Sequence, residues 1–253
     1  MSSLNLVLKT KERTAQFLVV NPETADFWLE IHNNVNRNLQ KASVIKEARD
    51  MTNGRWIITH EGIAFDWDGE AIDGQHRLHA IKESGLAQEL LVVRGLDPAG
   101  RMVVNTGRPR RPADILKLMK KEGVTTNNVA VVRQMMNGLN RRATMTEIVD
   151  AWDIHNGAAK TAIAFFPTNL KRIGIAPVYG VLGVASYTQD LEKLQEFADV
   201  LYTGRGNGKK GHSAPLILRQ YLLDLPSRGD GLCRYITGVT QFALLSFLAN
   251  EKV

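Results

Sequence analysis

Apolar residues follow two different spacings along this 253-residue chain, and this change of pattern limits the folds that it can adopt. Up to about residue 107, short apolar runs typical of strands alternate with helical patterns. From Pro112 onward, apolar residues recur every three to four positions, as in amphipathic helices. The sequence therefore predicts an α+β N-terminal domain, residues 1–107, followed by an all-helical domain, residues 108–253.

Turn and cap residues delimit the expected elements. Strands are expected over residues 3–9, 15–20, 89–96 and 101–107, and as a β-ribbon over 55–73 with its turn at Asp68-Gly69. Helices are expected from Pro22 to about residue 35, over 41–53, and over 75–84, where Gly85 ends the helix. In the second half, helices are expected over 112–121, 126–140, 146–165, 176–187, 190–202, 213–225 and 232–249.

The net charge of +6 is distributed unevenly. Residues 1–100 hold 11 Lys and Arg against 14 Asp and Glu, whereas residues 101–142 hold 10 against 2. A second basic segment, TGRGNGKKGHSAPLILR at 203–219, contains no acidic residue. Such segments attract polyanions by counterion release, so nucleic acid is the expected partner, with a solvated basic surface as the alternative interpretation.

Composition excludes several classes of protein. No apolar run approaches the ~20 residues that span a bilayer, and no basic-then-apolar leader precedes the first strand, so a cytoplasmic protein without membrane contact is expected. The single cysteine, Cys233, excludes an internal disulfide and a zinc site built from cysteines.

The motif AIDGQHRLHAIKESG, residues 71–85, joins an expected strand to an expected helix. The first turn of a helix leaves backbone amides free to bind an anion, and Gly74 lets a phosphate approach the backbone closely. Arg77 can donate two parallel hydrogen bonds to phosphate oxygens, and His76 can add a further donor. Because Gln75 is also expected to face a ligand, the motif predicts a phosphate-binding turn.

Asp73 follows the strand directly, and its carboxylate has several uses open to it. It can cap the helix, hold His76 in one tautomer, bind a metal or accept a substrate proton. His76 and His79 lie three residues apart and could share a metal with Asp73, but nothing else in the sequence completes a ligand set. Asp73 and His76 are therefore the candidate catalytic residues, and no dedicated metal site is expected.

Asp66 and Asp68 lie in IAFDWDGEAID, which resembles the first motif of haloacid-dehalogenase-type phosphatases. In that motif one Asp attacks phosphate and the second acts as an acid. The helical second half offers no parallel strands for the family's remaining motifs, so a hairpin turn is the better interpretation of this segment.

Three stretches resemble phage and bacterial members of the ParB/sulfiredoxin-like superfamily: GIAFDWDGEAIDGQHRLHAIKESG, LLVVRGLDPAG and NTGRPRRPADIL. The resemblance is strongest over residues 55–116 and weaker over 33–56 and 201–223. It implies an N-terminal domain with a small mixed sheet and helices, in which a box after a strand binds nucleotide phosphates. By position it also implies that Arg37 lies near the bound nucleotide.

Departures from the superfamily narrow its possible activities. Sulfiredoxins have a reactive cysteine where this chain has Gln75, so that activity is not expected. Partition proteins have a Gly-Glu-Arg-Arg box, of which Arg77 is the secure match, and this puts a CTP-gated clamp in doubt. A free-serine kinase of the superfamily has an Asp-Gly-His-His-Arg box, which Asp73, Gly74, His76 and Arg77 match at four places of five.

Further residues are expected to serve the phosphate site or DNA. Thr106 and Gly107 end an expected strand, so the arginines that follow would emerge beside the phosphate site if the strands are neighbours. The residues expected to bind phosphate or nucleotide are Gly74, Gln75, His76, Arg77, Arg37 and Thr106. Those expected to bind nucleic acid are Arg108, Arg110, Arg111, Arg205, Lys209 and Lys210.

Three hypotheses follow. In the first, a nucleotide-dependent, DNA-associated protein binds a nucleoside triphosphate or diphosphate, with or without Mg²⁺, and hydrolyses it or transfers a phosphoryl or related group in phage-type DNA modification or processing. In the second, the same turn serves a non-catalytic regulator that binds nucleotide or DNA, because the amide of Gln75 cannot act as a general base. In the third, Asp66, Asp68 or Asp73 serves a metal-dependent ParB-like nuclease. The sequence names neither the base, the acceptor nor the oligomeric state.

Overall fold

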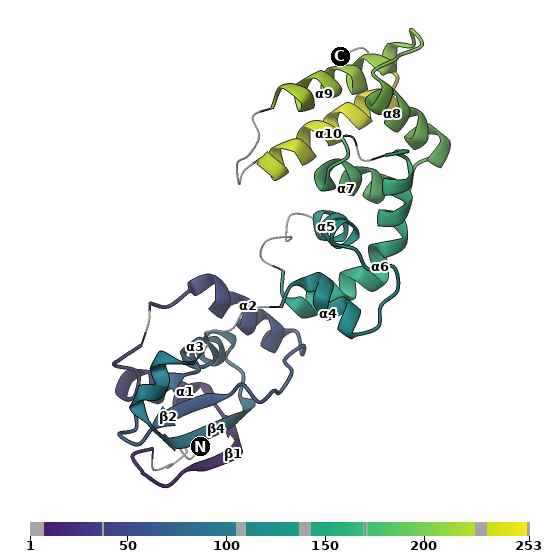
Figure 1. The fold of residues 1–253 in the computed structure, drawn as a ribbon. Helices are drawn as coiled ribbons and strands as arrows, with labels where there is room; N and C mark the ends of the chain where they lie inside the picture. Colours follow the sequence, from purple (N-terminus) through teal and green to yellow (C-terminus); the bar gives the residue numbers. More distant parts are fainter. Residues whose placement is uncertain are drawn as a thin grey trace. The chain divides into compact units, whose positions relative to one another are not determined.

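The chain folds into two compact units, Met1–Pro109 and Arg110–Val253 (Figure 1). The structure is a computed structural model, and it describes residues 8–36, 38–104, 110–136, 143–168, 170, 172–225 and 232–251. Among these residues, the buried side chains form two hydrophobic cores with no member in common, one in each unit. The expected α+β class is confirmed, with a sheet in the first unit and ten α-helices along the described chain.

The first unit contains a four-stranded mixed sheet. Its strands are β1 (Thr14–Val20), β2 (Ile63–Asp66), β3 (Ala71–Asp73) and β4 (Gln88–Leu96), in the spatial order β1-β4-β2-β3. β1 and β3 run antiparallel to their neighbours, whereas β2 and β4 are parallel. The hairpin between β2 and β3 turns at Asp68-Gly69 as expected, and Gly69 has a φ of +84°, which glycine adopts readily.

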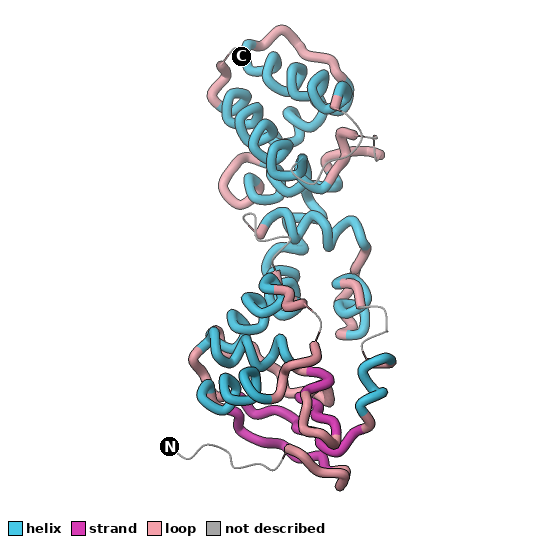
Figure 2. The backbone as a smooth tube through the Cα atoms, turned by 90° about the vertical axis from the view of Figure 1, so that its left-hand side faces the viewer, coloured by secondary structure: helices cyan, strands magenta, loops and turns pink. Residues whose placement is uncertain are grey.

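Helices of the first unit lie along one side of the sheet (Figure 2). They are α1 (Pro22–Ile31), α2 (Lys41–Thr52) and α3 (Gln75–Ser84), and α3 packs against both of the others. Leu90 and Val92 of β4 are buried in the same core as residues of these helices. Phe17 and Val19 of β1 are exposed, because side chains alternate between the two faces of a strand.

The described part of the second unit contains helices and no strand, as its apolar periodicity predicts. Its α-helices are α4 (Pro112–Leu118), α5 (Thr126–Met135), α6 (Met145–Ala164), α7 (Ala176–Ala185), α8 (Leu191–Thr203), α9 (Ser213–Asp224) and α10 (Leu232–Leu248). A short 3-10 helix, Lys210–His212, precedes α9. Along the described ranges of both units, every helix is too short or too polar to cross a membrane.

Two expected strand segments are wrong. Residues 98–102 form a 3-10 helix instead of opening a strand at residue 101, because the carboxylate of Asp97 accepts a hydrogen bond from the Ala99 amide and Pro98 begins the turn. Met102 and Val103, which suggested the strand, are exposed. Residues 55–62 are not a strand either, so the β-ribbon is limited to 63–73.

Candidate functional site

Gly74 joins β3 to α3 at a turn that presses against the start of β2. Its φ is +99°, and a Cβ atom at this position would lie 2.9 Å from Ile63 Cα and 3.0 Å from the Gly62 carbonyl oxygen. Both the backbone angle and the close approach require glycine here. The turn therefore holds Asp73 and the first residues of α3 against the beginning of β2.

Arg77 is directed toward this same junction. Its Nη1 donates to the carbonyl oxygen of Gly62 at 2.9 Å and lies 3.7 Å from Asp73 Oδ2. Its Nη2 donates to Glu61 Oε2 at 2.9 Å. The Arg77 side chain is 17% exposed and that of Glu61 is 57% exposed. The guanidinium is thus paired within the protein, and an incoming anion has to displace the exposed carboxylate of Glu61.

His76 and Gln75 are placed differently from the expected phosphate donors. His76 Nε2 accepts a hydrogen bond from the backbone amide of Gln40, the residue that precedes α2, at 3.1 Å. This nitrogen therefore carries no proton to donate, and His76 ties the start of α3 to the start of α2. Gln75 is a buried residue, so the expectation that it faces a ligand is wrong.

Glu47 is a carboxylate at this site that sequence reasoning missed. It lies on α2, and its Oε2 is buried without a hydrogen-bond partner among the described residues. Burial raises the pKa of Glu47, the positive charge of Arg77 opposes this rise, and the carboxylates of Asp50, Asp73 and Glu61 add to it. Its place between the buried Val44 and Met51 along one helix is the sequence signal that could have identified it.

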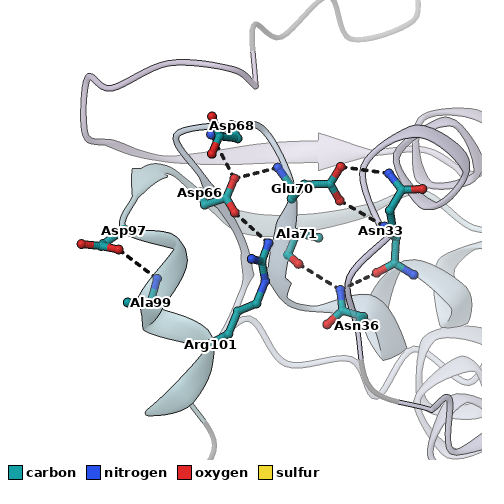
Figure 3. A network of polar contacts seen from close by, with 10 residues as sticks. Asn33, Asn36, Asp66, Asp68, Glu70, Ala71, Asp97, Ala99 and Arg101 are labelled. Carbon is teal, nitrogen blue, oxygen red and sulfur yellow. Dashed lines mark hydrogen bonds and ion pairs between the residues drawn. The ribbon is translucent and has the colours of Figure 1, made fainter.

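Asp66 lies at the end of β2 and is fully occupied by structural contacts (Figure 3). Its Oδ1 accepts hydrogen bonds from the backbone amides of Asp68 and Glu70, at 3.0 and 2.9 Å. Its Oδ2 accepts from Arg101 Nη2 at 2.7 Å, and the Asp66 side chain is only 2% exposed. These contacts agree with the hairpin-turn interpretation of this segment, and they leave Asp66 unable to act as a nucleophile that faces a substrate.

Asparagine side chains extend this polar network toward the segment after α1 (Figure 3). Asn36 Nδ2 donates to the carbonyl oxygen of Ala71 at 2.9 Å, and Asn34 Nδ2 donates to Glu70 Oε1 at 2.9 Å. These bonds fix residues 33–36 against β3. Arg37, which the resemblance implied lies near a nucleotide, falls outside the described residues.

The described residues provide no cluster of three or more His, Cys, Asp or Glu side chains that could hold a metal ion. Asp66 is bound by Arg101, so one of the three carboxylates expected for a metal-dependent nuclease is already paired within the protein. His79 of α3 is half-buried, and burial, followed by the charge of Lys82, lowers its pKa.

The cationic residues expected to bind nucleic acid come from two parts of the sequence, residues 108–111 and the basic segment at 203–219. Arg110 and Arg111 are exposed at the start of the second unit, and the Arg111 amide donates to Asp114 Oδ2 at 3.3 Å. Arg108 falls outside the described residues, as does Thr106, which was expected to bind phosphate or nucleotide. The strand that was expected to bring these arginines beside the phosphate site is not formed over residues 101–104, so that argument for their position is lost.

The basic segment at 203–219 faces acidic side chains of α8. Lys209 Nζ lies 2.8 Å from Glu196 Oε1, and the buried His212 shares the same carboxylate through Nε2 at 3.0 Å. A cavity of about 530 Å³ is lined by Arg205 together with further residues: Glu192, Gln195, Glu196, Asp199, Val200, Thr203, Gly206, Asn207 and His212. Lys210 is exposed. The count of Lys and Arg in residues 203–219 therefore overstated how basic this surface is, because acidic side chains of α8 lie beside it.

In comparisons with known proteins, no protein-family model, curated protein or solved structure matches the chain.

Proposed function

We propose that the turn from Asp73 to Arg77 binds a phosphate group of a nucleotide, and that the protein uses this nucleotide in association with DNA. The observation that carries the proposal is the Arg77 guanidinium, whose outer partner is the largely exposed carboxylate of Glu61. A phosphate can replace this carboxylate and accept the same charge-assisted hydrogen bond, because both groups offer anionic oxygens to the guanidinium fork. The first turn of α3, which begins after Gly74, supports anion binding through the dipoles of its peptide groups.

The ligand in this proposal is a nucleoside triphosphate or diphosphate, with or without Mg²⁺. Arg77 and the carboxylates of Asp50, Asp73 and Glu61 all lie close enough to Glu47 to interact with it electrostatically. Mg²⁺ bound to the nucleotide would reduce the repulsion between these carboxylates and the phosphates. The resemblance to the ParB/sulfiredoxin-like superfamily supports the same class of ligand.

Binding without turnover is the form of this function that the geometry favours. His76 Nε2 already accepts a hydrogen bond from Gln40, and Gln75 is buried, so neither serves readily as a proton acceptor for a substrate. Hydrolysis or phosphoryl transfer stays a second candidate, because Asp73 is partly exposed beside Arg77 and could accept a proton. Release of inorganic phosphate from labelled nucleotides by the wild type, and its loss in Asp73→Asn, would select this second form.

Binding of labelled ATP, CTP, GTP and their diphosphates to the full chain tests the phosphate site. Arg77→Ala removes the guanidinium, and we expect affinity to fall about 10- to 100-fold, as for loss of a charge-assisted hydrogen bond. Arg13→Ala, a change at an exposed arginine of the same unit, is the matched control and should bind like the wild type. Equal binding by the wild type and Arg77→Ala would contradict the proposal.

Glu61→Gln provides a second test that does not remove Arg77. The substitution keeps a hydrogen-bond acceptor for the guanidinium but removes the negative charge that competes with phosphate. We therefore expect tighter nucleotide binding than in the wild type. Circular dichroism of all variants confirms that each is folded, and weaker binding by a folded Glu61→Gln protein would count against displacement of this carboxylate.

Association with DNA is proposed for exposed cations of the second unit, among them Arg110, Arg111 and Lys117. Fluorescence anisotropy with duplex DNA at several salt concentrations measures the number of phosphates contacted. Loss of one contact in Arg110→Ala should reduce the slope of log affinity against log salt by about 0.9. Lys209→Ala is the matched control, since Lys209 is paired with Glu196, and an affinity that does not change with salt would overturn the proposal.

A further inference from the structure

Glu47 lies on α2, the helix that packs against α3, next to buried residues of the same helix. Ala48 and Met51 are part of the core of the first unit. The Oε2 atom of Glu47 is removed from solvent and lacks a hydrogen-bond partner among the described residues. A charged carboxylate in this position loses its hydration without gaining an equivalent bond, so a proton on Glu47 is favoured.

Ionic groups from three other parts of the first unit act on Glu47. Arg77 of α3 stabilises its negative charge, whereas Asp73 of β3 and Glu61 before β2 oppose it, as does Asp50 on its own helix. Arg77 in turn donates hydrogen bonds to Glu61 and to the Gly62 carbonyl oxygen. Arg77 is therefore the one cation among these five groups, and the Oε2 atom of Glu47 is buried without a hydrogen bond to it or to another described residue.

An anion that takes the place of Glu61 changes the balance at Glu47. A phosphate with more negative charge than one carboxylate neutralises Arg77 more completely and adds repulsion toward the remaining carboxylates. The charged form of Glu47 becomes less stable, while its protonated form is hardly affected. Occupation of Arg77 by an anion is thus expected to draw a proton onto Glu47.

We propose that the protonation of Glu47 is linked to the charge around Arg77, and that anion binding at this turn is coupled to the uptake of one proton by Glu47. This inference rests on the proposed phosphate site and adds its regulation by pH. The site is then expected to bind a polyphosphate less tightly as the pH rises. Glu47 acts through the charge on Arg77 and need not touch the ligand.

Isothermal titration calorimetry of the full chain with trimetaphosphate tests the coupling, because the charge of this anion is constant between pH 5 and 9. Titrations in two buffers with different heats of ionisation measure the protons taken up. For the wild type we expect proton uptake and an affinity that falls by up to about tenfold per pH unit, the limit for one linked proton. Glu47→Gln should bind with no proton uptake and nearly the same affinity at every pH.

Two controls separate Glu47 from other titrating groups. Glu83→Gln, at an exposed position of α3, should retain the coupling of the wild type. A pH dependence in Glu47→Gln as steep as that of the wild type would assign the linked proton to another group and overturn the role of Glu47. Circular dichroism across the pH range shows that each variant is folded where its binding is measured.

The possible outcomes distinguish this inference from the proposed function. Trimetaphosphate binding that requires Arg77, with proton uptake lost in Glu47→Gln, supports both. Binding that requires Arg77 but has the same proton uptake in wild type and Glu47→Gln overturns the role of Glu47 and leaves the phosphate site standing. No binding to the wild type between pH 5 and 9, or equal binding to Arg77→Ala, overturns the phosphate site and the inference with it.

Discussion

At the scale of single residues, the same residue types serve binding and folding at different positions in the first unit. Asp66 and Asp73 both end short strands, yet Asp66 is enclosed by two backbone amides and Arg101, whereas Asp73 is partly exposed beside Arg77. The sequence alone placed both among the candidate metal ligands. What separates them is the direction of side chains that arrive from distant segments, such as Arg101.

Asp66→Asn is predicted to destabilise the first unit. The amide removes the charge that pairs with Arg101 and leaves a guanidinium facing a buried position, so we expect a loss of about 3 kcal/mol in the free energy of unfolding. Urea unfolding followed by tryptophan fluorescence measures the loss. The same substitution at Asp68, an exposed residue of the same turn, should change stability by less than about 0.5 kcal/mol. Equal stability of the two variants would contradict a structural role for Asp66.

The motif residues show how far sequence reasoning reaches at this scale. Gly74 was expected to let a phosphate approach the backbone closely, whereas the segment that approaches it in the structure is the start of β2, at Gly62 and Ile63. Arg77 was expected to face outward to a ligand, but its guanidinium bonds to the Gly62 carbonyl oxygen. Local pattern identifies the turn, while the partner of a long side chain depends on which segment the fold brings beside it.

At the scale of elements, turns and caps predicted helices better than apolar content predicted strands. Gly85 and Asn53 mark the ends of α3 and α2 as expected, since each signal acts within one helical turn. The run RMVV had the composition of a strand, but Asp97 and Pro98 start a 3-10 helix there. A strand also needs a neighbour to pair with, and composition does not supply that information.

The contact between α2 and α3 gives a prediction of stability against pH. Because burial raises the pKa of Glu47, the folded chain binds more protons than the unfolded chain between the ordinary pKa of a glutamate and the raised value. Glu47 therefore costs stability that is absent at low pH and grows as the pH rises through this window. Glu47→Gln should unfold like the wild type near pH 4 and be more stable by about 1 kcal/mol at pH 8.

Urea unfolding of the wild type and Glu47→Gln at pH 4 and pH 8 measures this difference. Glu83→Gln, the exposed control on α3, should show no dependence of its stability difference on pH. If Glu47→Gln were less stable than the wild type at pH 8, its carboxylate would have to be stabilised by Arg77 more than it is destabilised by burial. That result would contradict the assignment of burial as the larger of the two effects on Glu47.

At the scale of the whole molecule, the change in apolar spacing near residue 108 coincides with a change in how the chain is packed. The buried residues of the first unit lie between Leu8 and Val92, and those of the second between Ala113 and Phe247. No described side chain belongs to both cores. Each unit therefore has the means to unfold as a cooperative transition of its own.

Differential scanning calorimetry of the full chain is expected to show two transitions, and two Gly→Ala variants assign them. A Cβ at Gly62 would lie 1.7 Å from the carbonyl oxygen of Leu91, so Gly62→Ala forces β2 and β4 apart and should cost about 3 kcal/mol or more. Gly157 is exposed on α6 with open space around it, so Gly157→Ala should gain about 0.5–1 kcal/mol from helix propensity alone. The first variant should lower one transition temperature by roughly 12 °C or more, and the second should raise only the other by about 2 °C. A single transition that both variants move would show that the two cores unfold together, and the chain would then be one cooperative body in spite of its separate cores.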